Sequence, residues 1–295
     1  MSRLVTLGEG MVEFHAEAPG LYRQGFAGDA VNTAIHASRL GVEAALVSRI
    51  GADVFAEGLC AAWLSEGLDL SHAPVVPGEN GLYVISTDPA GERSFAYRRA
   101  GSAASQLSQA DLDAGWLGEA DMVLTSGITQ AISDTAQSLV AAVAALPGLK
   151  GKLAHDPNHR PSLWAKRGGD TAARQALAEV AGRVAWLLPS WPADAVLLEG
   201  IASTPAEAAR RFAANGADVA LKMGDQGVLI LQAGTLTHVP AQPDAVVVDT
   251  TGAGDAWNAA FLVGLLRGEV AEASAVIANA YAATILAHRG AIPPR

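Results

Sequence analysis

The segment from Asp249 to Asp255, DTTGAGD, contains residue types that could transfer a phosphoryl group. Gly252 and Gly254 allow a sharp turn, and the apolar run 256–266 predicts a helix with Asp255 in its first turn. Free N–H groups and the helix dipole at a helix start attract an anion. A carboxylate beside such a site could accept a proton while the backbone holds a phosphate. The alternative is an ordinary glycine turn with an aspartate near a helix start.

A second group of candidates follows a predicted strand at 152–155, in the segment from Asp156 to Trp164. Such residues lie at the carboxyl end of an open α/β sheet, where these sheets bind ligands. Arg160 is the candidate clamp, because a planar guanidinium binds a carboxylate or a phosphate through paired hydrogen bonds. The segment 222–227, KMGDQG, also follows a strand, and its glycines could let a nucleotide approach closely. A plain turn is an equal alternative there.

Two polar features at the start of a predicted helix at 30–40 suit a polyol. Gly28 permits close approach of the backbone, and Asn32 offers both a donor and an acceptor in the first helical turn. The alternative is a glycine turn followed by a capping asparagine.

An aromatic face is predicted on the strand 93–99. Alternate residues of a strand point to the same side, so Phe95, Tyr97 and Arg99 share one face. Tyr83, on the predicted partner strand, is expected across from this face. An aromatic pair that ends in arginine, outside the main sheet, indicates one wall of a pocket. The alternative is an amphipathic edge strand.

Composition and charge exclude several classes of function. Half of the 295 residues are apolar, so a large core can be buried, and the net charge of −10 argues against a nucleic-acid partner. The single cysteine, Cys60, excludes an internal disulfide. No signal peptide precedes the strand at 4–7 and no apolar run is long enough for a membrane helix, so we expect a cytoplasmic protein. No Walker A, Gly-x-Ser-x-Gly or His-Glu-x-x-His motif occurs.

An alternation of strands and helices predicts a mostly parallel α/β sheet with helices on both faces. Two strands, 81–87 and 93–99, interrupt this rhythm around a turn at 88–91 and are expected to form an additional small sheet. A loop is expected at 22–28. Further strands are predicted at 4–7, 11–14, 44–47, 122–124, 152–155, 184–188, 219–222, 228–231, 236–239 and 246–248, and helices at 30–40, 55–66, 134–145, 171–181, 206–214, 254–266 and 271–288.

Together these segments resemble the ribokinase-like, or PfkB, family of sugar kinases. Residues 249–262 match the C-terminal signature of the family, and residues 27–51 match its N-terminal signature, including the spacing from Asn32 to Gly41 and Gly51. The resemblance covers essentially the whole chain. It implies one ribokinase-like kinase domain at 1–295, with a mostly parallel central sheet, helices on both faces and a small β-sheet lid. The lid strands are expected at about 11–14 and 81–99.

Within the family, the chain is most similar to the 2-keto-3-deoxygluconate kinases. The similarity lies in the segments 28–33, 97–105 and 158–164. Fructokinases share the patterns around Arg160 and Arg99, whereas other residues favour the keto-deoxy sugar acid, namely Asp29 and the Ser-Ala-Ala-Ser run at 102–105. The resemblance thus implies phosphorylation of the terminal C6 hydroxyl of 2-keto-3-deoxygluconate by ATP.

Two alternatives stay open at this point. One is a fructokinase or another sugar kinase of the same fold. The other is a catalytically silent module that binds a sugar or a nucleotide, against which Asp255 and the intact turn at 252–254 argue.

The resemblance also implies a role for each candidate residue. Asp255 would be the general base, with the backbone of Gly252, Ala253 and Gly254 as the anion hole. The sugar acid would contact Gly28, Asn32, Tyr83, Tyr97, Arg99 and Arg160. The nucleotide would be bound by Asn158, Ser190, Lys222, Gly224, Gly227, Gly252, Gly254 and Asn279.

The implied cofactors are ATP and Mg²⁺, with a monovalent cation near Asp249 as a further expectation. Many family members carry Asn-x-x-Glu near the Mg²⁺, but this chain has Ser190 and Ala193 at those positions and Asp194 one residue later. The protein ligands of Mg²⁺ are therefore left unassigned, and phosphate oxygens and water are expected to supply most of its coordination. Exposed lid edges predict a homo-oligomer joined through the lid sheets.

Overall fold

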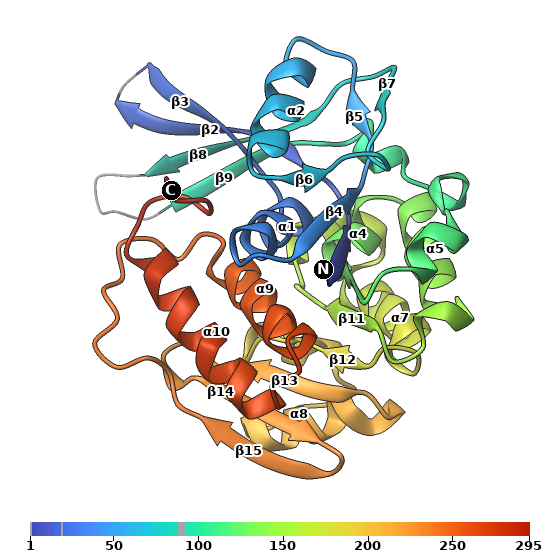
Figure 1. The fold of residues 1–295 in the computed structure, drawn as a ribbon, viewed down its shortest axis with the longest axis vertical. Helices are drawn as coiled ribbons and strands as arrows, with labels where there is room; N and C mark the ends of the chain where they lie inside the picture. The colour runs from blue at the N-terminus through green and yellow to red at the C-terminus, as the bar shows by residue number, and fades with distance from the viewer. Residues whose placement is uncertain (1, 19, 88–92) are drawn as a thin grey trace.

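A nine-stranded sheet forms the centre of the computed structural model, which describes residues 2–18, 20–87 and 93–295 (Figure 1). Six neighbouring pairs are parallel, and two antiparallel strands extend one edge. The predicted mostly parallel α/β sheet is thereby confirmed. In order across the sheet, the strands are β15 (Thr235–Val239), β14 (Val228–Gln232), β13 (Asp218–Lys222), β12 (Trp186–Leu187), β11 (Leu153–Asp156), β10 (Met122–Ser126), β1 (Arg3–Leu7), β4 (Glu43–Val47) and β6 (Leu68–Asp69).

Helices cover both faces of this sheet (Figure 1). Since successive side chains of a strand alternate, Leu153 enters one core and Ala154 enters the other. The core that contains Ala154 is closed by α1 (Asp29–Arg39), α2 (Ala56–Ser65), α9 (Ala253–Leu266) and α10 (Ala271–Leu286). The opposite core is closed by α5 (Asp134–Ala144), α7 (Gly169–Ala181) and α8 (Pro205–Phe212), with the short helices α3 (Ala114–Gly118), α4 (Gly127–Ile132) and α6 (Pro161–Trp164) on the same side. The seven predicted helices are confirmed to within a few residues.

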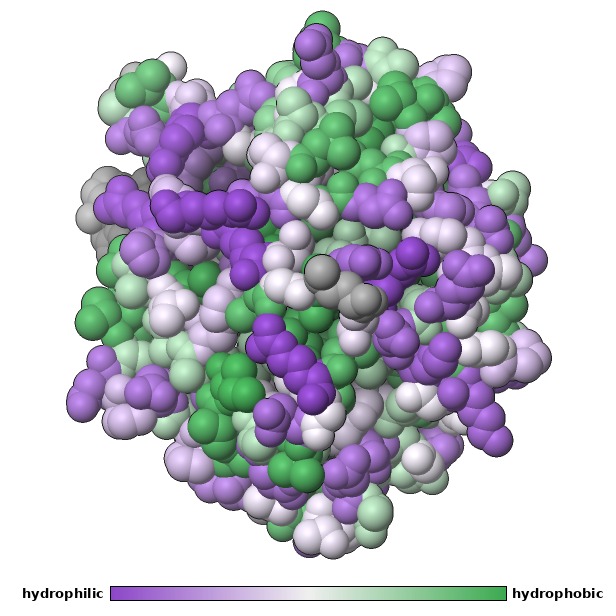
Figure 2. Space-filling view, viewed as in Figure 1, coloured by the Kyte–Doolittle hydropathy of each residue, from purple (hydrophilic) through white to green (hydrophobic). Residues whose placement is uncertain are grey.

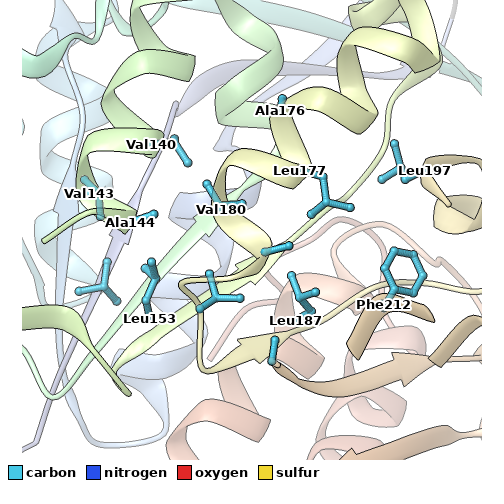
Figure 3. Packing of buried hydrophobic residues seen from close by; sticks show 14 of the residues in the cluster. Val140, Val143, Ala144, Leu153, Ala176, Leu177, Val180, Leu187, Leu197 and Phe212 are labelled. Atoms are coloured by element: carbon cyan, nitrogen blue, oxygen red, sulfur yellow. The ribbon is translucent and has the colours of Figure 1, made fainter. Parts of the chain in front are cut away.

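Close packing under α5 and α7 keeps β11 and β12 in place (Figure 3). Val140 of α5 and Val180 of α7 are fully buried, and they belong to the same core as Leu153 of β11 and Leu187 of β12. The loops that follow these strands are therefore anchored in a rigid layer. Within the described part of the chain, no helix is both long enough and apolar enough to cross a membrane.

A separate four-stranded sheet, which we call the small sheet, extends away from the central sheet at the upper left of Figure 1. Its strand order is β3 (Leu21–Ala27), β2 (Met11–Ala18), β8 (Gly81–Thr87) and β9 (Arg93–Arg98). The predicted strands at 11–14, 81–87 and 93–99 are thus confirmed, while the predicted turn at 88–91 lies outside the described residues. A two-stranded pair, β5 (Ile50–Gly51) and β7 (Val75–Val76), completes the sheets.

Two predictions about local structure were wrong. Residues 22–28 were expected to form a loop, but most of them belong to β3, which pairs antiparallel with β2. Most side chains of β3 are exposed, so its sequence lacks the apolar alternation that marks a half-buried strand. Residues 246–248 were expected to form a strand, but these valines lie on an exposed loop, where the N–H of Val248 donates to the carbonyl of Leu286.

Candidate active site

A glycine turn starts α9 and places Asp255 in the first turn of that helix. Gly252 has a φ of 74°, and a Cβ added there would lie 2.5 Å from the Cβ of Ala291. The position therefore requires glycine for its backbone conformation and for its contact. Ala253 donates its N–H to the carbonyl of Thr250 at 3.3 Å. The N–H groups of Gly254 and Asp255 have no carbonyl one turn earlier within the helix, so they can bind an anion.

A polar pocket of about 150 Å³ opens beside this turn. It lies where the loops after β11, β12 and β13 meet the start of α9. These loops follow the carboxyl ends of neighbouring parallel strands. The sequence predicted this position for candidate segments that follow strands. Seven residues proposed from the sequence line this pocket together, namely Asn158, Arg160, Ser190, Lys222, Gly252, Gly254 and Asp255.

Asp255 is half-buried, and the environment of its carboxylate favours the protonated form. Burial raises its pKa to about 8, and the negative charges of Asp29 and Asp156 act in the same direction. A hydrogen bond from Asn32 Nδ2 at 2.8 Å and the charge of Arg160 oppose this rise. A carboxylate with a pKa near neutrality is suited to accept a proton and to release it again.

Asn32 holds the carboxylate of Asp255, and Gly28 in turn holds the side chain of Asn32. The Oδ1 of Asn32 accepts the N–H of Gly28 at 3.3 Å, while its Nδ2 donates to Asp255. Gly28 has an extended backbone, but a Cβ added there would lie 2.4 Å from the carbonyl oxygen of Glu9. Glycine is therefore required because the start of α1 packs directly on the loop between β1 and β2.

Lys222 is held at the pocket by two residues that the sequence analysis missed. Its Nζ lies 2.8 Å from Asp156 Oδ2 and 2.9 Å from Asn258 Oδ1, and Asn258 Nδ2 donates to the same carboxylate oxygen at 2.6 Å. Asn258 could have been found from its spacing, because it lies three residues after Asp255 on one helical face. Lys222 thus balances the charge of Asp156.

Asp194 follows the two positions, Ser190 and Ala193, at which the chain departs from the Asn-x-x-Glu pattern. Its carboxylate accepts the N–H of Ser190 at 2.7 Å and that of His159 at 2.8 Å. Burial and the charge of Asp156 raise the pKa of Asp194. Among the residues that the structure describes, no group of three or more His, Cys, Asp or Glu side chains is arranged to hold a metal ion.

The aromatic face of the small sheet is arranged as predicted. Tyr83 and Tyr97 are direct partners on β8 and β9, with their rings stacked at 5.5 Å between centroids. The guanidinium of Arg99 lies 4.3 Å from the centre of the Tyr97 ring and forms an ion pair with Glu9. The hydroxyl of Tyr83 donates to Glu13. Burial and the charges of Glu13 and Asp255 raise the pKa of Tyr83, so this face lies within electrostatic reach of Asp255.

Three of the residues expected at the nucleotide, Asn279, Gly224 and Gly227, do not line the polar pocket. Asn279 is outside the polar pocket, where its side chain donates to Pro240 and accepts from Trp257. Gly224 and Gly227 both have positive φ, and a Cβ at Gly227 would lie 2.2 Å from the carbonyl of Val239. Gly227 and Asn279 therefore flank the same short loop, at the edge of the sheet.

Residues 290–291 contact the turn at 249–252 that precedes α9. Gly290 donates its N–H to Asp249 Oδ2 at 2.7 Å, and the same carboxylate accepts the N–H of Thr251 at 2.8 Å. The carbonyl of Ala291 accepts a hydrogen bond from Nε2 of the buried His36 at 3.0 Å. Burial lowers the pKa of His36 to about 4, so the ring is neutral at physiological pH. The monovalent cation expected near Asp249 stays a prediction.

Comparisons with known proteins match this chain over its whole length. The family model described as pfkB family carbohydrate kinase matches residues 1–295. A 2-dehydro-3-deoxygluconokinase from Dickeya dadantii (strain 3937) is 33% identical over 306 aligned positions, covering 99% of this chain and 96% of that protein.

Solved structures of similar proteins confirm the ribokinase-like fold. The crystal structure of a PfkB protein from Polaromonas sp. JS666 has a TM-score of 0.87 and 28% identity, covering 97% of this chain and 96% of that one. An E. coli protein assigned as ribokinase II, in complex with ATP and Mg²⁺, has a TM-score of 0.86 and 26% identity, covering 99% and 94%.

The turn that starts α9 yields a stability test with its own control. We expect Gly252→Ala to cost about 1–2 kcal/mol for the left-handed backbone alone, or roughly 2–8 °C in Tm, and overlap with Ala291 adds to this cost. Gly254→Ala should leave Tm unchanged or slightly higher, because an added Cβ meets open space there. Thermal unfolding followed by circular dichroism measures both. Equal changes in the two variants would show that neither the backbone conformation nor the contact with Ala291 requires glycine at position 252.

Proposed function

This chain belongs to the pfkB family of carbohydrate kinases, and we propose that it phosphorylates the C6 hydroxyl of 2-keto-3-deoxygluconate with ATP. The substrate is the same compound as the 2-dehydro-3-deoxygluconate in the name of its relative from Dickeya dadantii. The observation that carries the proposal is the position of Asp255. A half-buried carboxylate with a raised pKa lies at a helix start, in one pocket with Arg160.

In the proposed reaction, Asp255 accepts the proton of the C6 hydroxyl as its oxygen attacks the γ-phosphorus. The new O–P bond forms while the bond to the β-phosphate oxygen breaks, and ADP leaves with that electron pair. The N–H groups of Gly254 and Asp255 and the dipole of α9 stabilise the negative charge that develops on the phosphoryl oxygens. Asn32 keeps the carboxylate of Asp255 oriented.

ATP and Mg²⁺ suit the donors of the polar pocket. Anion donors at the start of α9, with Arg160 and Lys222 beside them, suit the phosphates, and Asn158 and Ser190 line the same pocket. Because no cluster of metal-binding side chains occurs in the described residues, we assign the coordination of Mg²⁺ mainly to phosphate oxygens and water. When bound, Mg²⁺ neutralises charge on those oxygens.

We assign the adenosine end of ATP to the edge of the sheet beside Gly224, Gly227 and Asn279. Figure 2 shows hydrophobic residues on this side of the molecule, over α10 and on the loop that precedes α9. Val246 and Val247 on that loop are 65% and 63% exposed, which is unusual for valine and suits contact with a flat base.

We assign the substrate carboxylate to Arg160 and Arg99. The small sheet then acts as a lid, with Tyr83 and Tyr97 as a wall that excludes water from the transferring phosphate. We also propose a homo-oligomer joined through the small sheets, because β3 and β9 are edge strands with unpaired backbone groups on one side.

A fructokinase is the second candidate, because both arginine patterns also occur in fructokinases. A coupled assay of ATP consumption across a panel of sugars and sugar acids separates the alternatives. The proposed function requires the highest kcat/KM for 2-keto-3-deoxygluconate. A preference for fructose would support the second candidate, and no consumption with any sugar would support a silent binding module.

The base assignment predicts a large loss of rate in Asp255→Asn. We expect kcat to fall by about 10²-fold or more, with little change in the binding of ATP or the sugar acid, since the amide cannot accept the proton. Asp69→Asn is a suitable control, because Asp69 is exposed on β6 and the amide oxygen can keep its bond to the N–H of Ser71. A kcat near that of the wild type would remove Asp255 from the base role.

The raised pKa of Asp255 predicts a specific pH dependence. Only the ionised carboxylate accepts a proton, and it predominates above a pKa of about 8. At saturating substrates, kcat should therefore rise about tenfold per pH unit below that pKa and level off above it. A flat profile between pH 6 and 9 would contradict this role, provided that the chemical step limits kcat.

The carboxylate assignment predicts that Arg160→Ala affects acids more than neutral sugars. Loss of a charge-assisted contact costs roughly 1.5–3 kcal/mol, so KM for 2-keto-3-deoxygluconate should rise about 10- to 150-fold. KM for fructose should change much less. Arg183→Ala, at an exposed arginine that follows the C-terminal end of α7, serves as the control. Equal effects on both sugars would place Arg160 at the nucleotide instead.

A further inference from the structure

A buried ion pair connects the small sheet to the central sheet. Glu9 lies in the loop between β1 and β2, and its side chain is 1% exposed. Arg99 follows β9, and its side chain is 10% exposed. Their contact crosses from the carboxyl end of a central strand to the strand that carries Tyr97. Arg99, which was expected to meet the substrate, therefore has a carboxylate partner within the protein.

This ion pair leaves hydrogen-bonding capacity unused. In the described part of the chain, Glu9 Oε2 and Arg99 Nε are both buried without a hydrogen-bond partner. A guanidinium has five donor hydrogens and can bind a carboxylate in a paired geometry, whereas Glu9 contacts it here through one oxygen only. Arg99 is thus held by stacking on Tyr97 and by a single anionic contact, and it keeps donors for a second anion.

The surroundings of Glu9 make its charge depend on Arg99. Burial raises the pKa of Glu9 to about 7 even though Arg99 opposes the rise, and the nearby Asp29 of α1 adds to it. Burial raises the pKa of Asp29, and the charge of Asp156 adds to this rise whereas Arg99 opposes it. Glu13 of β2 is engaged by Tyr83, and Asp255 lies beyond Asp29. An anion that binds Arg99 therefore weakens the effect of Arg99 on Glu9 and raises the pKa of Glu9 further.

We infer that Glu9 is a positioning residue that holds Arg99 before the substrate binds and takes up a proton when the carboxylate of the substrate binds Arg99. This inference rests on the proposed function, because it needs an anionic substrate. The proton comes from solvent and stays on a carboxylate oxygen of Glu9 while the substrate is bound. No bond other than that O–H forms or breaks.

Proton-linked binding has a defined dependence on pH. Above about pH 7, Glu9 is mostly ionised before the substrate binds, so each substrate bound requires up to about one proton from solvent. The Kd for the sugar acid should then rise by up to about tenfold per pH unit between pH 7 and 9. A purely structural Glu9 would give a Kd that is independent of pH in this range.

The test is isothermal titration of 2-keto-3-deoxygluconate without ATP, in two buffers with different heats of ionisation. Asp255→Asn serves as the parent protein, so that protonation of Asp255 cannot contribute. We expect uptake of about 0.5–1 proton at pH 8 in this parent. Adding Glu9→Gln should abolish the uptake and flatten the dependence of Kd on pH. Adding Glu13→Gln should leave the uptake in place, because Glu13 is bonded to Tyr83 rather than to Arg99.

Uptake that is absent from the parent, or that survives Glu9→Gln, would overturn the inference. If Glu9→Gln does not fold, the parent protein at pH 6 replaces it, because Glu9 should then be mostly protonated before binding and the uptake should nearly vanish. The proposed function and the role of Glu9 can be contradicted separately. A sugar acid that neither binds nor consumes ATP contradicts the proposed function, whereas one that is phosphorylated without proton uptake contradicts only the role of Glu9.

Discussion

A carboxylate withdrawn from water is the constraint on which the rest of the site depends. Asp255 is half-buried, and two further carboxylates, Asp29 and Asp156, lie close enough to raise its pKa. Such a group is costly unless hydrogen bonds and cations offset the loss of hydration. The surrounding residues meet this need separately, since Asn32 bonds Asp255 itself while Lys222 neutralises Asp156. The crowding of carboxylates makes Asp255 more basic than an exposed aspartate.

The parts of the molecule that were predictable are those encoded within one segment. The turn before α9 depends on glycines and an aspartate that are adjacent in sequence. The face formed by Tyr97 and Arg99 follows from the alternation of side chains along one strand. The central sheet was predictable for the same reason, because apolar strands alternate with amphipathic helices along the chain.

The remainder depends on contacts between segments that are distant in sequence. β3 exists because β2 pairs with it, and no apolar alternation marks it. Val246 to Val248 have high strand propensity, yet they lie on an exposed loop, so tertiary context overrides propensity. The Lys222–Asp156–Asn258 cluster and the Glu9–Arg99 pair each join different elements, and a side chain's partner cannot be deduced from its own neighbours in sequence.

The contact between Ala291 and Gly252 has a consequence for the order of events during synthesis. Gly290 and Ala291 leave the ribosome well after the turn that carries Asp255, yet they brace that turn. The central strands and the small sheet can form earlier, since their residues emerge first. A nascent chain can thus form its small sheet before the turn that carries Asp255 is fixed, and kinase activity should appear only after Gly290 and Ala291 have emerged.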